Sequence, residues 1–349
     1  MPTSFSKKIT FQDIVGWEDE AFEGAYGAIH NSFEIFLKNP DSCPLEIRES
    51  LQKIADIFFK SSLKTRTELR RFFENFFEPM CFSEKTKGFF TAYYEIALRG
   101  SRTKSDRYGV PLYAVPSDLE RIKISKDGQI HPYYTREEIM KDALKQEPFL
   151  WVDDPIEAYF LHVQGSGLIN LENGDVLRVG HSGNNRHPYV SLRGILEDDQ
   201  KIFAPGSLTK ESLEGYLRTL SPAALSEVLA LNPRYIFFEE IKLVRDEGPR
   251  GHQGKPGKAV SLTPLRSLAV DHHYIPLGLP VWVQVFDLNS DVKFLFPRLM
   301  MAQDTGSAIK GPNRGDIFWG TGDKAGKIAG NIRNVGDMIV FFPKSNCLN

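Results

Sequence analysis

The chain has little cysteine and no excess of charge of one sign. Its three cysteines (Cys43, Cys81, Cys347) are an odd number with wide spacing. Neither a disulfide framework nor a zinc site follows from them, so we interpret them as buried or incidental thiols. Lysine and arginine number 43 against 45 aspartates and glutamates, which gives a formal net charge of −2. No global basic field therefore favours a nucleic-acid partner.

Long apolar runs are also missing. No stretch of eighteen apolar residues occurs, which argues against a transmembrane helix. The first residues, Met-Pro-Thr-Ser-Phe-Ser-Lys-Lys, contain neither the apolar core nor the small-residue cleavage site of a signal peptide. A mature or shortened form, a start assigned too late and a cytoplasmic protein are three alternatives that the sequence leaves open.

What the chain does have is material for a large core. Its 349 residues are 41% hydrophobic and 12% aromatic, which is typical of a soluble protein with two domains, or one domain with a large insertion. The first ninety residues predict helices. An apolar stripe at Ile47, Leu51, Ile54 and Phe58 has helical spacing, and Thr65-Arg-Thr-Glu68 is a capping box at the start of another helix.

The last hundred residues instead predict strands. Short apolar runs separated by turns lie at 267–271, 280–286, 297–303, 315–319 and 337–342, a pattern typical of a small barrel or a sandwich. Before them, residues 246–258 are rich in Gly, Pro and Lys and predict a loop at a domain boundary or a flap. Further upstream, Ser221 and Pro222 predict a helix cap and first turn.

Two aspartates stand out in this strand-rich region. Asp304 ends an apolar run, and Asp316 precedes Ile317-Phe-Trp319. An acid on a strand edge beside aromatic rings suits a raised pKa and contact with a sugar ring. Asp304-Thr-Gly-Ser also resembles the loop of aspartic proteases. Those enzymes need two such loops, whose aspartate carboxyl groups share one proton, and this chain has only one such loop.

Other polar motifs lie on glycine-rich turns and suit a carbohydrate ligand, whose hydroxyls need hydrogen-bonding partners and whose ring faces need aromatic ones. We expect Tyr93, Tyr94, Gln164, Lys310 and Trp319 to contact that ligand. The pair His272-His273 could suggest a metal. Neighbours on a strand, however, point to opposite faces, so we expect no metal site and no cofactor.

The order of these motifs resembles the membrane-bound lytic murein transglycosylase A family, whose members cleave bacterial peptidoglycan. The resemblance covers about residues 85–343. It is carried by Phe89-Phe-Thr-Ala-Tyr-Tyr-Glu95, Val163-Gln-Gly-Ser-Gly-Leu168, Asn232-Pro-Arg-Tyr235, Leu262-Thr-Pro-Leu-Arg-Ser267, Ala302-Gln-Asp-Thr-Gly306 and Asp316-Ile-Phe-Trp-Gly-Thr-Gly322.

The resemblance implies a mainly β protein with a helical N-terminal region, in which a double-psi β-barrel is interrupted by an inserted, mostly β second domain. The barrel domain would comprise residues 1–103 and 244–349, and the insert residues 104–243 would form the other wall of a glycan groove. Asp316 would be the catalytic acid and base, with Asp304 supporting it. The family implies a periplasmic or outer-membrane-associated protein, although no lipobox cysteine lies near the start. We expect a monomer.

In the implied reaction one carboxyl group acts twice. It protonates the leaving oxygen of the bond between N-acetylmuramic acid and N-acetylglucosamine, and then takes a proton from the muramic C6 hydroxyl as that oxygen closes a 1,6-anhydro ring. Two alternatives remain. An expansin-like, non-catalytic wall-binding protein would use the same barrel without releasing product. A hydrolase with two carboxylates would use Asp304 as a base and would add water.

Overall fold

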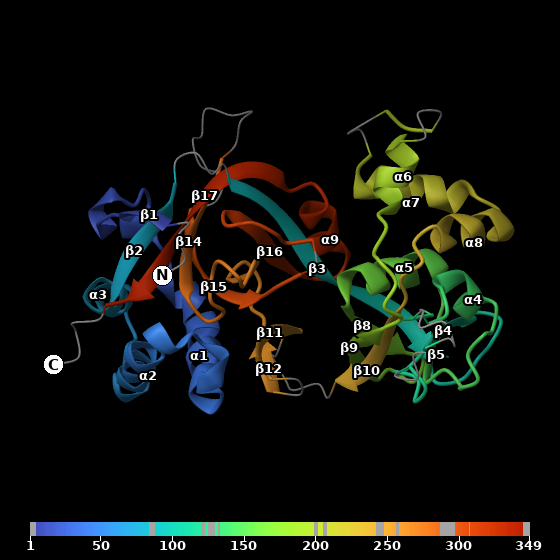
Figure 1. Cartoon of the computed structure of the whole chain (residues 1–349), viewed down its shortest axis with the longest axis horizontal. Helices are drawn as coiled ribbons and strands as arrows, with labels where there is room; N and C mark the ends of the chain where they lie inside the picture. The colour runs from blue at the N-terminus through green and yellow to red at the C-terminus, as the bar shows by residue number, and fades with distance from the viewer. Residues whose placement is uncertain are drawn as a thin grey trace. The chain divides into compact units, whose positions relative to one another are not determined.

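The computed structural model describes residues 5–83, 88–119, 123–124, 130–131, 133–198, 202–204, 208–241, 248–255, 258–286, 297–306 and 308–344 (Figure 1). The chain divides into two compact units. Unit 1 comprises residues 1–93, 250–320 and 332–349, and unit 2 comprises residues 94–249 and 321–331. Strand β3 (Gly88–Ser101) runs from unit 1 into unit 2, and β16 (Arg314–Thr321) ends at the second crossing.

Unit 1 combines helices from the N-terminal region with strands from both ends of the chain. Its other elements are β1 (Phe5–Lys8), η1 (Phe11–Asp13), η2 (Trp17–Asp19), α1 (Phe22–Lys38), η3 (Pro40–Ser42), α2 (Leu45–Lys60), α3 (Arg66–Phe76), β2 (Phe77–Phe82), β11 (Arg250–Lys255), β12 (Lys258–Ser261), β13 (Ser267–Val270), β14 (Pro280–Val285), β15 (Arg298–Asp304) and β17 (Arg333–Pro343).

Among its described residues, unit 2 combines short strands with five helices of the inserted stretch and a sixth from the C-terminal part. Its elements are β4 (Val110–Leu112), β5 (Lys123–Ile124), β6 (Ile130–His131), α4 (Arg136–Met140), β7 (Leu150–Val152), α5 (Pro155–Gln164), β8 (Ser166–Leu171), β9 (Val176–Asn184), α6 (Leu192–Asp198), α7 (Lys210–Thr219), α8 (Pro222–Ala230), β10 (Ile236–Ile241) and α9 (Asp323–Ala329).

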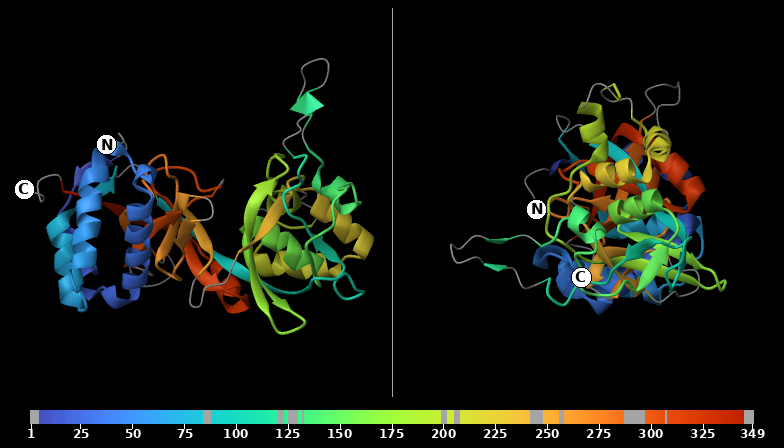
Figure 2. Two further views of the ribbon diagram at one scale, coloured as in Figure 1. Left: turned by 90° about the horizontal axis from the view of Figure 1, so that it is seen from below. Right: turned by 90° about the vertical axis from the view of Figure 1, so that its right-hand side faces the viewer.

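The helical N-terminal region is confirmed (Figure 2). The Thr65 hydroxyl accepts a hydrogen bond from the Glu68 backbone N–H, and the Glu68 carboxylate accepts from the Thr65 N–H, which is the predicted capping box at the start of α3. Along α2, Leu51, Ile54 and Phe58 are buried in the main core. Helix α1 packs against both α2 and strand β15, so the helices cover one side of the strands.

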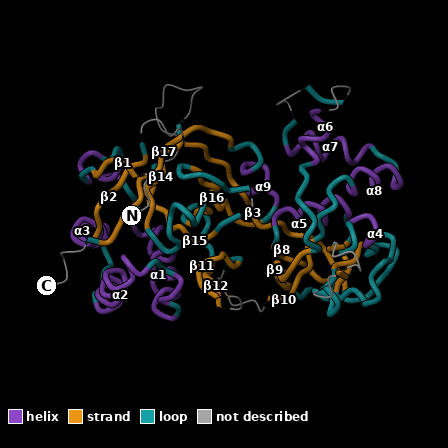
Figure 3. The backbone as a smooth tube through the Cα atoms, viewed as in Figure 1, coloured by secondary structure: helices purple, strands orange, loops and turns teal. Residues whose placement is uncertain are grey.

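The predicted C-terminal strands are all present, and their ladder closes on itself. Strand β17 pairs with β14, which is followed in order by β15, β13, β16 and β3, and β3 pairs with β17 again. The β13–β15 ladder is parallel, whereas β13–β16, β14–β15 and β14–β17 are antiparallel. Of the two architectures left open by the sequence, the structure shows a barrel (Figure 3).

Two local expectations were wrong. Within the predicted loop 246–258, residues 250–255 form strand β11 and residue 258 begins strand β12, which pairs with β11 in a hairpin. Residues 246–247 and 256–257 lie outside the described ranges. His272 and His273 do not lie on a strand. Strand β13 ends at Val270, and the two histidines belong to the turn that follows, where their rings stack on each other.

Unit 2 is built on a sheet in which β8 pairs in parallel with β3 and β9 pairs antiparallel with both β8 and β10. Glu95 of β3 and Arg178 of β9 form a buried ion pair at 2.6 Å, and the Thr321 hydroxyl donates to the same carboxylate at 2.8 Å. Helix α8 begins at Pro222 with Ser221 as its cap, as predicted. Among the helices of the described residues, none has the length and apolar character needed to cross a membrane.

A buried ion pair ties the N-terminal segment of unit 1 to its strands. The Arg266 guanidinium donates to the Glu20 carboxylate at 2.6 Å and to the Leu299 carbonyl at 2.9 Å. The other Glu20 oxygen accepts from the Leu299 N–H at 2.8 Å. Glu20 is 4% exposed and Arg266 8%, so each charge depends on the other for compensation.

Removing one partner of this pair should strongly destabilise unit 1. We expect Glu20→Ala to lower the free energy of unfolding by about 3–5 kcal/mol, because the Arg266 charge is left buried without a counter-ion. Urea denaturation followed by tryptophan fluorescence measures the change. The control is Glu34→Ala, which breaks an exposed pair with Lys38 and should cost less than about 0.5 kcal/mol. Equal losses in the two variants would contradict the prediction.

Candidate functional site

The two predicted aspartates lie on either side of one short strand in unit 1. Ala269 of β13 is in register with Asp304 of β15 on one side and with Asp316 of β16 on the other. Residues in register on neighbouring strands place their side chains on the same face of the sheet. The aspartate Cα atoms are therefore two inter-strand spacings apart, about 10 Å. Between them Ala269 contributes only a methyl group.

A register shift places Asp304 in this row. The β13–β15 ladder pairs Leu268 with Ala302 and then Ala269 with Asp304, so that Gln303 is the extra residue of a bulge. Its side chain is buried, and its amide donates to the Ala28 carbonyl at 3.0 Å and to the Ser32 hydroxyl at 2.9 Å. Bulges of this kind redirect side chains next to functional sites. Without the extra residue, Asp304 would face the other side of the sheet.

Asp316 is partly buried and has a raised pKa. The Thr91 hydroxyl of β3 donates to its carboxylate at 2.5 Å, and the Arg314 guanidinium donates to the same hydroxyl at 2.8 Å. Burial raises the pKa of Asp316 from 3.8 to about 6, and nearby Asp304 adds to the rise, whereas the Thr91 hydrogen bond and the Arg314 charge oppose it. The carboxyl group can thus be protonated in mildly acidic solution.

Asp304 is held by several hydrogen bonds. The Tyr93 hydroxyl donates to one carboxylate oxygen at 2.7 Å. The other oxygen contacts the His252 imidazole through Nδ1, and accepts from the backbone N–H groups of His252 at 3.1 Å and of Thr305 at 2.9 Å. Burial, as the main cause, and the negative charge of Asp304, as the second, raise the pKa of Tyr93 well above its ordinary range. The Tyr93 hydroxyl therefore remains protonated and donates its hydrogen bond. The hydrogen bond to Asp304 raises the pKa of His252.

His252 and Thr91 are the residues that sequence reasoning missed. His252 lies on β11, in the segment expected to be a loop. Gly251 makes the approach of β11 to β15 feasible, because a Cβ at this position would lie 2.5 Å from the Gln303 carbonyl oxygen. A glycine directly before a histidine was the available signal. Thr91 was inside a motif that was noted for its tyrosines, and its role depends on a pairing 225 residues distant.

Among the residues predicted to contact a ligand, Tyr93 donates a hydrogen bond to Asp304, whereas Trp319 lies on the face of β16 opposite Asp316. Alternation along β16 places Asp316 and Phe318 on one face, and Phe318 packs with Tyr93 at a ring distance of 5.3 Å. Trp319 lies on the opposite face and packs against the main core. Lys310 is exposed near Asp271, beyond the end of β13.

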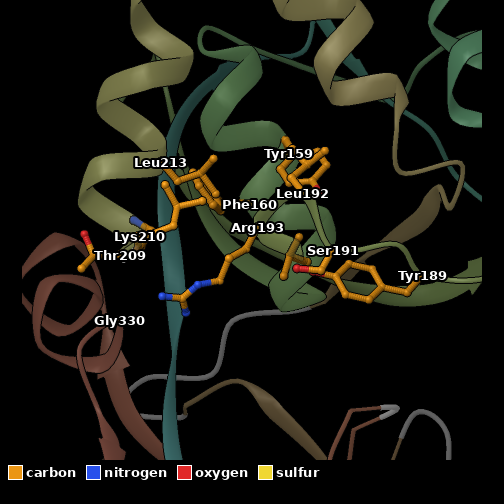
Figure 4. A pocket seen from close by; sticks show the side chains of 12 residues that line it. Tyr159, Phe160, Tyr189, Ser191, Leu192, Arg193, Thr209, Lys210, Leu213 and Gly330 are labelled. Carbon is orange, nitrogen blue, oxygen red and sulfur yellow. The ribbon is translucent and has the colours of Figure 1, made fainter. Parts of the chain in front are cut away.

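Tyr94 and Gln164 belong to unit 2. Tyr94 is buried, and the Lys210 ammonium lies 5.1 Å from its ring centre. Gln164 is the last residue of α5, before Gly165 with a φ of 83°. Unit 2 has a cavity of about 210 Å³ (Figure 4). Its lining combines apolar side chains with two cationic groups, among them Phe160, Leu192, Leu213, Arg193 and Lys210.

Comparison with known proteins gives two family models and several relatives. The model of the MltA specific insert domain matches residues 89–239, and that of the 3D domain matches residues 266–341. The membrane-bound lytic murein transglycosylase A of Escherichia coli K12 is 29% identical over 252 residues, which are 71% of this chain and 63% of that protein. The match thus spans less than two thirds of the curated relatives' own length.

Two solved structures are similar over almost the whole chain. The lytic transglycosylase LtgG of Burkholderia pseudomallei is 34% identical with a TM-score of 0.64, and the match covers 99% of this chain and 97% of that one. The MltA of Escherichia coli with bound chitohexaose is 23% identical with a TM-score of 0.74, covering 98% of this chain and 95% of that one. The second likeness concerns the fold alone.

Loss of the Thr91 hydroxyl should raise the pKa of Asp316 above about 6. In Thr91→Val the carboxylate loses the hydrogen bond that favours its charged form, whereas its burial is unchanged. Carbon-13 NMR of labelled aspartate side chains, followed from pH 3 to 9, measures the titration. Thr305→Val is the control, because Thr305 contacts Asp304 through its backbone N–H. An Asp316 titration at or below the wild-type midpoint in Thr91→Val would disprove the role of this hydroxyl.

Proposed function

Because the chain belongs to the MltA family of lytic transglycosylases, we propose that it cleaves the β-1,4 bond between N-acetylmuramic acid and N-acetylglucosamine in peptidoglycan and leaves 1,6-anhydro ends. The observation that carries the proposal is the Asp316 carboxyl group, whose raised pKa allows it to be protonated before the reaction begins. The closed ladder of β17, β14, β15, β13, β16 and β3 supports a double-psi β-barrel as the scaffold. The groove expected between barrel and insert stays a prediction.

Asp316 performs both proton transfers in this mechanism. Its protonated carboxyl group donates to the glycosidic oxygen as the bond to C1 of the muramic residue breaks and positive charge develops at C1. The resulting carboxylate then takes the proton of the C6 hydroxyl while the C6 oxygen forms the new bond to C1. No water is consumed, and Asp316 ends in its starting state. The nucleophile is held within the substrate, so no second carboxylate is needed to activate water.

Asp304 serves as a supporting group. One of its oxygens accepts from Tyr93, and the other accepts from the Thr305 N–H and contacts His252. These contacts fix the orientation of the carboxylate, and the identity of the products distinguishes a supporting group from the base of a hydrolase. Asp304 and Asp316 lie on the two strands that flank β13. At that separation the negative charge of Asp304 is suited to stabilise the positive charge that develops at C1.

Side chains in the same unit as these aspartates also support the proposal that the ligand is a glycan. Tyr93 presents an aromatic ring whose hydroxyl is fixed, and Lys310 is an exposed cation in the same unit. Chitohexaose, the ligand of the Escherichia coli relative, is a chain of β-1,4-linked N-acetylglucosamine and shares that linkage with peptidoglycan. We therefore propose peptidoglycan strands as the partner, with Tyr93, Tyr94, Gln164 and Lys310 as candidate contacts.

The identity of the products tests the proposal. Purified sacculi digested with the protein should yield muropeptides about 18 Da lighter than hydrolytic products, because no water is added. Asp316→Asn should form none of them while still binding sacculi, whereas Asp304→Asn should retain a reduced rate. Mass spectrometry of the soluble fraction measures both. Heavier, water-containing products would indicate a hydrolase, and binding without any release would indicate an expansin-like wall-binding protein.

Stability shows whether the inactive variant is still folded. Asp316 titrates near pH 6 in the folded protein but near 3.8 when unfolded, so its protonation stabilises the fold at low pH, and this contribution is lost as the pH rises through about 6. The amide of Asp316→Asn does not ionise, so the variant avoids this loss of stability at higher pH. At pH 7 the variant should be as stable as the wild type or more stable, by up to about 3 kcal/mol.

The rate of glycan cleavage should also decrease as the pH rises. Since Asp316 must begin protonated, kcat/KM for anhydro-muropeptide formation should fall about tenfold per pH unit above about pH 6. Initial rates between pH 4 and 9 measure the profile, with circular dichroism as the control for folding. In Thr91→Val the fall should begin at higher pH. A wild-type rate that is constant or increasing from pH 6 to 8 would contradict the assignment of Asp316 as the acid.

A further inference from the structure

The turn that follows β13 gathers three side chains that commonly bind metals. Asp271, His272 and His273 are consecutive, and they come directly after the strand that lies between the two aspartates. From the sequence, His272 and His273 were expected to lie on a strand, with side chains on opposite faces and no metal between them. In the structure their rings are stacked, with centres 4.3 Å apart and planes inclined by 30°. The two imidazoles therefore lie next to each other and not on opposite faces of a strand.

The distances are close to those of a coordination sphere. One ligand atom from each of the three residues lies within 4.8 Å of the others. Imidazole nitrogen and carboxylate oxygen bind zinc at about 2.0–2.2 Å, so two ligands of one tetrahedral ion are about 3.3–3.6 Å apart. Closing the remaining gap requires the imidazoles of His272 and His273 to turn toward Asp271. Both histidines are exposed, so solvent lies on one side of each ring.

The carboxylate of the cluster is already fixed in place. Asp271 is 4% exposed, and its two oxygens accept hydrogen bonds from the backbone N–H groups of His273 at 3.2 Å and of Gly311 at 2.9 Å. Backbone donors of this kind orient a metal-binding carboxylate without occupying all of its lone pairs. The Nδ1 atom of His273 lies 2.8 Å from the same carboxylate. A metal ion can replace the proton shared by these two groups.

We propose that Asp271, His272 and His273 form a binding site for a divalent transition metal of the Zn²⁺ class. Two imidazoles and one carboxylate suit such ions, whereas Mg²⁺ and Ca²⁺ prefer oxygen ligands. Three protein ligands leave at least one position open to water. Binding releases the proton held between His273 and Asp271. The positive charge of Lys310, near Asp271, limits the affinity, but this side chain is exposed and can turn away.

The site is close to the supporting aspartate. The His272 imidazole contacts the Thr305 hydroxyl at 3.5 Å, and the Thr305 N–H donates to Asp304 at 2.9 Å. A bound ion would thus be connected to Asp304 through a single residue. Metal binding itself is independent of the proposed cleavage reaction, so either can be tested while the other fails.

Calorimetric titration of the chain with Zn²⁺ tests the site. The protein should carry no polyhistidine tag and should first be dialysed against a chelator and then against buffer. We expect one Zn²⁺ per chain, and an affinity at least about tenfold weaker in both His272→Ala and His273→Ala, since each removes one of three ligands. Titration with Ca²⁺ should give no comparable binding, because the set contains only one oxygen ligand.

A second histidine–aspartate pair in the same unit gives the matched control. His252→Ala removes the imidazole on Asp304 and should leave Zn²⁺ binding unchanged. Electron paramagnetic resonance of the Cu²⁺-loaded wild type should show coupling to two imidazole nitrogens, reduced to one in His273→Ala. Absence of stoichiometric Zn²⁺ binding would overturn the proposal. It would equally be overturned if binding persisted in His272→Ala and His273→Ala, or if it were lost in His252→Ala.

Discussion

The register of β13 is the constraint on which the site depends. Ala269 has one neighbour in each flanking strand, and these neighbours are Asp304 and Asp316. A shift of either ladder by one residue would turn one aspartate to the opposite face. Everything that fixes the register therefore fixes the chemistry. The small side chain of Ala269 also matters, because a larger one would fill the space between the two carboxylates.

The N-terminal helices act on this register from outside the barrel. Gln303, the bulge residue, donates its amide hydrogens to Ala28 and Ser32 of α1, and Glu20 holds the start of β15 through the Leu299 N–H. These contacts join residues more than 240 positions apart in the sequence. The helical region, which looks like a simple packing scaffold in the sequence, is thus part of what positions Asp304.

The parts of the fold that were predictable depend on local patterns. The capping box at Thr65, the stripe on α2 and the C-terminal strands all follow from spacing within a few residues. The pair Asp304 and Asp316 was recognisable for the same reason. His252 was not, because its role arises from a close approach of two backbones at Gly251, which no local period encodes. Trp319 shows the converse: it is only three residues from Asp316 along β16, but its side chain lies on the other face of the sheet.

The pKa of Asp316 reflects a balance between opposed influences. Burial alone would keep the carboxyl group neutral, which would impair the second role, as a base, that we propose for it. Thr91 moderates this, because its hydroxyl donates to Asp316 while accepting from Arg314, so the guanidinium charge acts through a hydroxyl and not by direct contact. A direct ion pair between Arg314 and Asp316 would hold the pKa of the carboxyl group low and would prevent it from acting as the proposed acid. The intermediate hydroxyl instead leaves the pKa near 6, where one group can both give and take a proton.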